Sequence, residues 1–500
     1  MTLEPQSHIR NVAIIAHVDH GKTSLVDEML KFSRVFRDNQ HVGTLIMDSD
    51  PQERERGITI LAKNTAIAYR DVTVNIIDTP GHVDFSGEVE RVMNLADGCL
   101  LVVDAVDGPM PQTRYVLRIA LAQGVRPVVV INKIDRPTAD AVATLSAIQD
   151  LFLELATEAD QLDFPVLYAS ARDGYAMTTP DGHAEDLSPL LDAILEHVPA
   201  PQADPDGPAQ MLVAALDYDN HLGQISIGRV FRGRVAPGAQ VVAVGHDGTV
   251  TPFRIDRVFQ FRDLARREVA SVGAGDIAAV SGLRDVSIGD TIAAPESPEP
   301  LERIAIEEPT VKMTFSVNTS PFSGRDGQYA TSRTLWTRLE RELRTNVSLR
   351  LERTDSADVF LVSGRGELHL AVLIESMRRE GMEFQVSKPE AVTTLINGKM
   401  HEPRELLSME TREEYVGVLT EELAQRLAQL RDMRHDGQGN VALQYEIPTR
   451  GLIGFRNFFL RVTRGNGVMN SELLGMEPMQ GEVRSLRSGA IVAAETGMAV

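Results

Sequence analysis

The sequence predicts a multidomain protein with a doubly wound α/β domain, an antiparallel β-barrel and two α+β domains of the ferredoxin-like type. Three observations carry this prediction. The chain has 500 residues, which is too long for one hydrophobic core. Residues 1–200 alternate apolar strand patterns with helical stretches, whereas short strands separated by glycines follow them. Proline-rich linkers at 199–207 and 294–300 divide these patterns, and helical patterns return after the second linker.

The α/β domain is expected over residues 1–200. Several of its predicted strands are apolar nearly throughout, as a parallel sheet covered by helices on both faces requires. The predicted strands span residues 11–16, 73–78, 99–104, 128–132 and 164–168. Ligands of such a sheet bind at the carboxyl ends of its strands, so a binding site is expected in the loops that follow these five segments.

The later domains are predicted from glycine spacing and alternating helix and strand patterns. A β-barrel is expected over residues 208–295, where glycines recur between short strands. Two α+β domains are expected over 304–392 and 393–482, each a split β-α-β sandwich.

Three helices are predicted within the α+β domains. One presents Leu335, Leu339 and Leu343 on a single face, and a second is expected over residues 367–380. A third is expected to begin at Thr411, which would form a T-x-x-E capping box with the glutamate three positions later. Its core face would consist of Tyr415, Leu419, Leu423, Leu427 and Leu430.

Composition narrows the class of protein. The formal net charge is −21, from 50 basic and 71 acidic residues, which argues against a general nucleic-acid binder but leaves local basic patches possible. The single cysteine, Cys99, cannot form an internal disulfide, which fits a reducing compartment. The amino terminus lacks the layout of a signal peptide, and no apolar run has membrane-spanning length. A cytoplasmic protein without a membrane segment is therefore expected.

The segment AHVDHGKT at 16–23 follows a predicted strand and precedes a helix, and it matches a phosphate-binding loop in all but Ala16, which replaces the first glycine. Backbone N–H groups of such a loop surround the phosphates, a lysine adds charge, and a hydroxyl binds Mg²⁺. Lys22 and Thr23 are the candidates for these two roles. The alternative is an ordinary glycine–lysine turn at a helix start. Candidate nucleotide-binding residues here are Asp19, His20, Gly21, Lys22, Thr23 and Ser24.

Two further segments suit the γ-phosphate end of a nucleotide. In DTPGH at 78–82, Asp78 can hold Mg²⁺ through water, and the Gly81 N–H can meet the γ-phosphate. In RGITI at 56–60, Thr59 can reach Mg²⁺ only when a γ-phosphate is present, which would make this segment an order–disorder switch. The alternatives are a common D-x-P-G turn and a solvated charged loop.

The segment NKID at 132–135 ends the fourth predicted strand. The carboxylate of Asp135 can accept hydrogen bonds from N1–H and the 2-amino group of guanine, a donor pair that adenine lacks. A backbone N–H at Ser170 or Ala171, after the fifth strand, can meet guanine O6. These elements stand in the correct order, each at the carboxyl end of a strand. Together they predict a site for GTP or GDP with Mg²⁺, involving Asn132, Lys133, Ile134, Asp135, Ser170 and Ala171.

AHVDHGKTSL, RGITI, DTPGH and NKID together resemble the translational GTPases of the elongation factor G class. The resemblance implies that His82 is the catalytic histidine, which orients the attacking water after docking on the ribosome. It also implies that Val18 and Ile58 form an apolar gate for that histidine.

Longer segments resemble the BipA (TypA) branch of that class. They are MDSDPQERERGITILAKNTAI, SGEVERVM, DAVDGPMPQTR, SVNTSPFSG, VSGRGELHLAVLIESMRREG and IPTRGLIGFR. Ala16 is usual in this branch. The branch carries a further C-terminal domain, so residues 483–500 are expected to begin it and the chain to be truncated.

The same resemblance implies a monomeric GTPase that binds the ribosome, with ribosomal RNA, ribosomal proteins and tRNA in the A site as partners. It implies a role in large-subunit assembly or in translation under stress. One alternative is a GTP-gated assembly module in which hydrolysis only drives release. A translocation catalyst fits less well, because the inserted domain of elongation factor G is missing. Candidates for contacts with RNA phosphates are Arg262, Arg266, Arg267, Arg378, Arg379 and Lys388, which could equally be solvated surface.

Overall fold

The computed structural model describes residues 3–33, 51–56, 59–80, 86–219, 221–245, 247–262, 265–302, 308–321, 323–325, 327–344, 346, 348–435, 439–465 and 467–483, apart from the side chains of Arg56 and Ser86. The chain forms two compact units, Met1–Lys388 and Pro389–Val500. Among the described residues, no helix is long and apolar enough to cross a membrane.

The first part of unit Met1–Lys388 is an α/β domain built on a seven-stranded sheet in the order β3-β4-β2-β5-β6-β7-β8. The inner pairs are parallel, whereas β3 and β8 run antiparallel at the two edges. All five predicted strands are confirmed, within two residues, and the two edge strands are additions. The strands are β2 (Ile9–Ala16), β3 (Lys63–Tyr69), β4 (Val72–Asp78), β5 (Gly98–Asp104), β6 (Arg126–Asn132), β7 (Val166–Ser170) and β8 (Tyr175–Met177).

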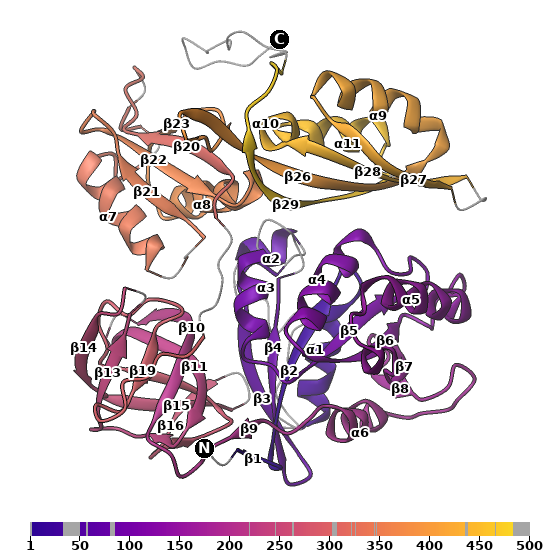
Figure 1. The fold of residues 1–500 in the computed structure, drawn as a ribbon, viewed down its shortest axis with the longest axis vertical. Helices are drawn as coiled ribbons and strands as arrows, with labels where there is room; N and C mark the ends of the chain where they lie inside the picture. The colour runs from indigo at the N-terminus through magenta and orange to yellow at the C-terminus, as the bar shows by residue number, and fades with distance from the viewer. Residues whose placement is uncertain are drawn as a thin grey trace. The chain divides into compact units, whose positions relative to one another are not determined.

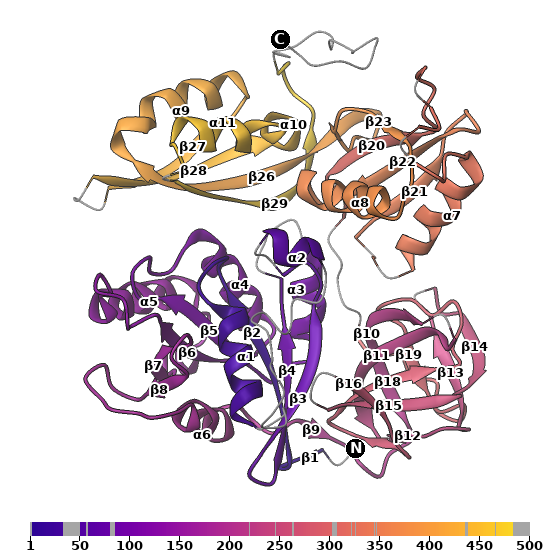
Figure 2. The same ribbon diagram turned by 180° about the vertical axis from the view of Figure 1, so that it is seen from behind.

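Helices cover both faces of this sheet, as its uninterrupted apolar strands require. Alternate residues of a strand point to opposite faces, so Ile15 and Leu101 pack with α3 to α5, while Ile14 and Leu100 pack with α1 and α6. In agreement, α4 lies in front of the sheet in Figure 1 and α1 in front of it in Figure 2. The helices are α1 (Lys22–Phe32), α2 (Pro51–Arg56), α3 (Ser86–Met93), α4 (Pro111–Ala122), α5 (Ala141–Leu155) and α6 (Ser188–His197).

The predicted β-barrel is an eight-stranded antiparallel sheet in the order β14-β13-β19-β10-β11-β18-β15-β16. Backbones approach closely where β10 and β11 pair, because a Cβ at Gly228 would collide with the carbonyl of Leu212. The strands are β10 (Gln210–Asp219), β11 (Gly223–Arg232), β13 (Gln240–Val244), β14 (Val250–Arg254), β15 (Arg257–Arg262), β16 (Ala265–Glu268), β18 (Ile277–Ser281) and β19 (Thr291–Ala293). Short pairs β1 (Glu4–Pro5) with β9 (Gln202–Ala203), and β12 (Arg234–Val235) with β17 (Val272–Gly273), complete this region.

Buried amides join the barrel to the α/β domain. Asn75 donates to Asn11 Oδ1 at 2.8 Å and to Asp276 Oδ1 at 2.9 Å. Asn11 in turn donates to the carbonyl of Gly275 at 2.9 Å. Satisfied buried polar groups of this kind fix one geometry, because any displacement leaves them without partners.

The last part of this unit is an α+β domain with the chain order β-α-β-β-α-β, as expected for the ferredoxin-like type. Its sheet runs β21-β22-β20-β23, and both helices pack their apolar faces on it. Leu335 and Leu339 are buried in this core, and Leu343 is partly buried against it. The elements are β20 (Val311–Ser316), α7 (Ser332–Leu343), β21 (Arg350–Arg353), β22 (Val359–Gly364), α8 (Glu367–Arg379) and β23 (Gln385–Val386).

Unit Pro389–Val500 repeats this arrangement, with strands ordered β27-β28-β26 and β29 added beside β26. Helices α9 and α11 cover its core. The elements are β25 (Thr394–Ile396), β26 (Lys399–Arg412), α9 (Glu413–Gln425), β27 (Gln429–His435), β28 (Asn440–Pro448), α10 (Thr449–Leu452), α11 (Phe455–Val462) and β29 (Val468–Pro478).

The predicted capping box at Thr411 is wrong. Thr411 belongs to β26 and pairs with Val441 of β28, so tertiary pairing extends the strand through the position where the local pattern predicts a cap. The helix begins at Glu413 and ends at Gln425. Its predicted core face therefore stops early: Leu419 and Leu423 are buried, but Leu430 is exposed in the next strand.

Candidate nucleotide site

The loop between β2 and α1 has the backbone shape of a phosphate cradle. β2 ends at Ala16, α1 begins at Lys22, and Gly21 caps the helix with a left-handed φ of +90°. A Cβ at Gly21 would also collide with the amide nitrogen of Asn132, so both backbone angle and space require glycine. The Leu25 N–H bonds to the Gly21 carbonyl at 3.0 Å, so the N–H groups of the turn before it can serve an anion.

Three side chains from separate segments meet at the amino terminus of α1. The Lys22 ammonium group donates to Thr59 Oγ1 at 2.9 Å and forms an ion pair with Asp78. All three residues are buried, Asp78 completely. The second oxygen of this carboxylate, Oδ2, is buried and has no hydrogen-bond partner among the described residues. The three motifs that sequence placed around one phosphate group therefore converge in the structure.

This cluster fits Mg²⁺. The ion binds proteins through one or two carboxylates and takes its remaining ligands from water and phosphate oxygens. Asp78 offers an oxygen without a partner, Thr59 offers a hydroxyl beside it, and Thr23 is half-buried in the first turn of α1. Within the described ranges there is no group of three His, Cys, Asp or Glu side chains that could hold a metal ion.

Asn132 ties three loops of the site together. Its amide nitrogen donates to the His20 carbonyl at 2.8 Å, and its Oδ1 accepts the Ala171 N–H at 3.0 Å. Asn132 itself is 1% exposed, so both bonds are shielded from water. The Ala171 N–H, one candidate for guanine O6, is thus bonded within the protein, and Ser170 Oγ donates to Asp173 at 2.8 Å. The phosphate loop and the loops after β6 and β7 are consequently held in one arrangement.

Lys133 adds a second connection. It adopts a left-handed backbone with φ of +63°, its ammonium group donates to the Asp19 carbonyl, and it pairs with Asp104 at 2.7 Å. Ile134 is half-buried and Asp135 is exposed in the same loop. The Asp135 carboxylate therefore remains open to a ligand placed at this edge of the sheet.

One residue that contributes to the site was not among the residues predicted from sequence. Asp104, at the end of β5, is buried and accepts the Val106 N–H at 2.8 Å as well as Lys133. Burial raises the pKa of Asp104, but bonds from Lys133 and Val106 outweigh it, and the pKa lies below its ordinary value. The sequence feature that could have identified Asp104 is its position at the end of the predicted strand 99–104.

His20 was predicted as a nucleotide-binding residue, but its protonation state was not. Burial, assisted by the neighbouring His17, lowers the pKa of His20 to about 3, so the imidazole is neutral near pH 7. Its Nδ1 accepts the Asp104 N–H at 3.3 Å, which places the proton on Nε2. A neutral histidine adds no positive charge beside the phosphate loop, so Lys22 and Lys133 supply the local charge.

The charged segment before Thr59 differs from the solvated loop that the sequence allowed. It contains α2, and Glu53 within it is fully buried. Three other predicted site residues, Ile58, Gly81 and His82, lie outside the described residues. Val18 is half-buried in the phosphate loop, and Ser24 is exposed at the start of α1.

Some of the arginines considered for RNA contact are paired with carboxylates. Arg266 lies 2.7 Å from Asp217, and Arg378 forms two bonds of 2.8 Å to Glu375. Arg379 bonds both to Glu375 at 2.7 Å and to Glu55. These three guanidinium groups are paired with carboxylates in the structure but stay partly exposed, so their contact with RNA phosphates stays a prediction.

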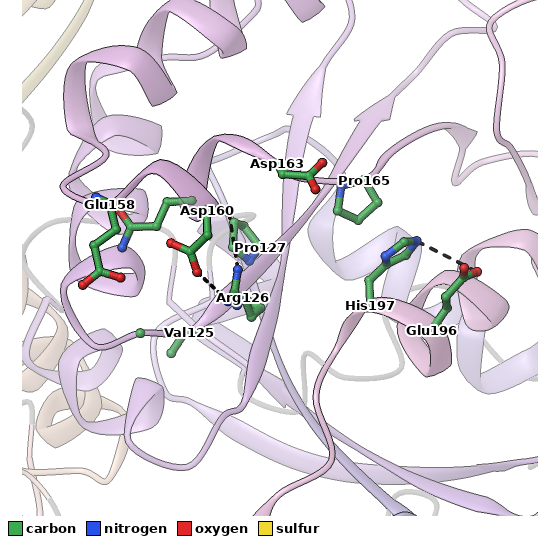
Figure 3. Close-up of a pocket in the computed structure, with 11 residues that line it drawn as sticks. Val125, Arg126, Pro127, Glu158, Asp160, Asp163, Pro165, Glu196 and His197 are labelled. Carbon is green, nitrogen blue, oxygen red and sulfur yellow. Dashed lines mark hydrogen bonds and ion pairs between the residues drawn. The ribbon is translucent and has the colours of Figure 1, made fainter.

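A pocket of about 340 Å³ lies at the opposite, amino-terminal edge of the sheet, between the starts of β6 and β7. Figure 3 shows Arg126 directed at Asp160, 2.6 Å away, and His197 facing Glu196. Glu158 and Asp163 add further carboxylates to the lining. Four carboxylates against one paired arginine repel a polyphosphate, so this pocket does not compete with the loop at Gly21 as a nucleotide site.

The fold and this site define a translational GTPase. Residues 7–200 match the elongation factor Tu GTP-binding domain, 223–293 match elongation factor Tu domain 2, and 399–487 match the elongation factor G C-terminus. A crystal structure of a protein from Thermus thermophilus has the same fold, with a TM-score of 0.67 at 18% identity over 95% of this chain and 97% of that one.

The relatives specify the branch. A protein from Synechocystis named large ribosomal subunit assembly factor BipA is 51% identical over 98% of this chain and 82% of its own length. Proteins of the same name from Bacillus subtilis and Salmonella typhimurium are 49% and 48% identical over 99% of this chain and 81% of theirs. The chain belongs to the BipA family. It is a GTPase that uses GTP or GDP with Mg²⁺.

Proposed function

We propose that this chain is a cytoplasmic, ribosome-associated GTPase that acts in assembly of the large ribosomal subunit or in translation under stress. The observation that carries the catalytic part is the convergence of Lys22, Thr59 and Asp78 at the amino terminus of α1. The names of the relatives, which are large-subunit assembly factors, support the ribosomal part. Ribosomal RNA and proteins, and tRNA in the A site, are the proposed partners of a monomer.

The proposed chemistry is positioning and charge stabilisation rather than covalent catalysis. Thr23 and Thr59, with Asp78 through water, would hold Mg²⁺, which would supply positive charge at the phosphate oxygens. Lys22 is released from Asp78 to the transferring phosphoryl group, and the N–H groups around Gly21 bind the same oxygens. Asp135 selects guanine, since its exposed carboxylate can accept two donors that adenine does not offer together. His82 orients the water, with Val18 and Ile58 as its gate.

His82→Ala tests the catalytic assignment. The affinity for GTP should stay nearly unchanged, because His82 is proposed to contact the attacking water and not the nucleotide. Ribosome-stimulated kcat should fall by about 10²-fold or more, the usual loss of a proton-handling or water-positioning group. A stimulated kcat within twofold of the unmodified chain would remove His82 from this role.

The same variant separates the proposal from a GTP-gated assembly module. If hydrolysis does the assembly work, cells carrying His82→Ala accumulate large-subunit precursors. If the GTP-bound shape does that work and hydrolysis only drives release, assembly survives while the variant stays bound to particles. Sedimentation profiles of subunits, probed for the bound variant, distinguish the two.

A further inference from the structure

The helix α2 (Pro51–Arg56) contains a glutamate in an unusual environment. Glu53 is 0% exposed although it lies in a run of charged residues. A buried carboxylate is retained only where hydrogen bonds and an opposite charge compensate for its lost hydration. The identity of these partners therefore indicates what the residue does.

The partners of Glu53 are the residues that follow Thr59. Its Oε1 accepts the N–H of Ile60 at 3.0 Å and that of Leu61 at 3.3 Å. Its Oε2 forms an ion pair with Lys63, at the start of β3. One carboxylate thus fixes two consecutive peptide groups and the strand that leads away from them.

Thr59 is the residue immediately before this fixed backbone. Its hydroxyl accepts from Lys22 at 2.9 Å, and Lys22 pairs with Asp78. With the peptide groups of Ile60 and Leu61 held, the threonine has little freedom to turn away from the cluster. Among the described residues, Glu53 forms no hydrogen bond or ion pair with Lys22 or Asp78, so its effect on the cluster would pass through Thr59.

The other side of α2 is anchored. Gln52 donates to Ser376 Oγ at 2.7 Å and to the Val372 carbonyl at 3.3 Å, both in α8. Glu55 accepts from Arg379 of the same helix at 3.0 Å. Glu53 therefore extends from a helix that is fixed to α8 by its neighbours Gln52 and Glu55, and a side chain needs such a fixed base if it is to restrain another segment.

We propose that Glu53 is a positioning residue for GTP hydrolysis, which holds Thr59 in place through the backbone of Ile60 and Leu61. The proposal rests on the proposed role of Thr59 at Mg²⁺. Because that contact requires a γ-phosphate, the restraint matters for GTP and for the hydrolysis step but not for GDP. A residue that only stabilises the fold would affect both nucleotides alike.

The test is Glu53→Gln in the full chain, which keeps the shape but removes the charge and half of the acceptors. Intrinsic single-turnover kcat should fall about tenfold or more, since bonds to a charged group are strong and mispositioned catalytic groups lose rate steeply. Affinity for GDP should stay within about twofold, whereas affinity for a non-hydrolysable GTP analogue should fall.

Glu402→Gln is the matched control. Glu402 is a carboxylate that is 1% exposed and paired with Arg450, but it lies in unit Pro389–Val500. The Glu402→Gln variant should have lower thermal stability than the unmodified chain, but the same intrinsic kcat and the same relative affinity for GTP and GDP. Unchanged kcat in Glu53→Gln, or parallel losses of kcat and GDP affinity, would overturn the proposal.

Amide hydrogen exchange of the unmodified chain gives a second measurement that does not depend on how the variant folds. With a GTP analogue bound, the Ile60 and Leu61 amides should exchange about 10²-fold or more slowly than an open segment would. Rapid exchange at both amides would refute the restraint. Failure of the unmodified chain to hydrolyse GTP at all would instead count against the proposed function, which keeps the two conclusions separate.

Discussion

Asn132→Ala should weaken nucleotide binding without any change in a residue that contacts phosphate. The substitution removes the bonds to the His20 carbonyl (2.8 Å) and from the Ala171 N–H (3.0 Å). Both backbone groups belong to buried residues, so each is left without its partner. An unsatisfied buried group costs about 1–3 kcal/mol, which gives about 2–6 kcal/mol for the pair.

If this cost destabilises the loop arrangement that binds the nucleotide, the affinity for nucleotide drops. A cost of about 2 kcal/mol corresponds to about 30-fold, and a cost of about 6 kcal/mol to more than about 10⁴-fold. The loss should appear mainly as faster release of a fluorescent GDP analogue, measured by stopped flow. Asn132→Asp should separate the two bonds, because it keeps an acceptor for Ala171 but places a carboxylate against the His20 carbonyl.

Gln161→Ala is the matched control. Its amide also bridges two backbone groups, donating to the Leu121 carbonyl at 3.2 Å and accepting the Thr157 N–H at 2.9 Å. It lies in the pocket at the opposite edge of the sheet, so it should leave release unchanged. Release rates within twofold of the unmodified chain for Asn132→Ala, at equal thermal stability, would refute the idea that this amide holds the site together.

Three further outcomes are expected. Asp135→Asn should weaken GTP and favour xanthosine triphosphate in competition titrations, because the amide can donate to the 2-oxo group; unchanged GTP affinity would place the guanine elsewhere. Because the pKa of His20 is lowered from 6.5 to about 3, the unfolded chain takes up its proton first as the pH falls, and stability is lost progressively between these values. At pH 5.5 the loss from this group is about 1.4 kcal/mol, and His20→Asn should flatten the dependence of melting temperature on pH over that range; an unaltered slope would contradict the assignment. Asn75→Ala, which loses bonds to Asn11 and Asp276, should destabilise the chain by about 2 kcal/mol in urea denaturation yet leave GTP affinity unchanged, and an unmoved midpoint would show that this amide contributes little.

Fold class and the order of the binding loops could be predicted because their signals are local. A strand that is buried on both faces can be recognised from a short run of apolar residues. Lys22, Asp78 and Asn132 each lie at the end of such a strand or in the loop and helix start that follow it. Parallel strands bring their carboxyl ends to one edge of the sheet, so motifs far apart in the chain are predicted to lie at one site.

The features that could not be predicted from the sequence depend on contacts between residues that are distant in the chain. Thr411 was predicted to cap a helix, but it pairs with Val441 in a β-sheet. The hydrogen bonds along the whole strand are together more stabilising than one local cap. The pairing of Arg378 and Arg379 with Glu375 likewise depends on the tertiary and local contacts of α8 and cannot be predicted from the charge pattern.

Glu53 is the clearest case of the same limit. Its neighbours in sequence are charged, which favours a solvated surface, yet its carboxylate is buried against the peptide groups of Ile60 and Leu61. The sequence by itself determined which chemical groups of this GTPase are candidates for contact with the nucleotide. Only the tertiary structure decided which groups hold them in place, because burial and charge compensation are properties of contacts between segments and not of the segments themselves.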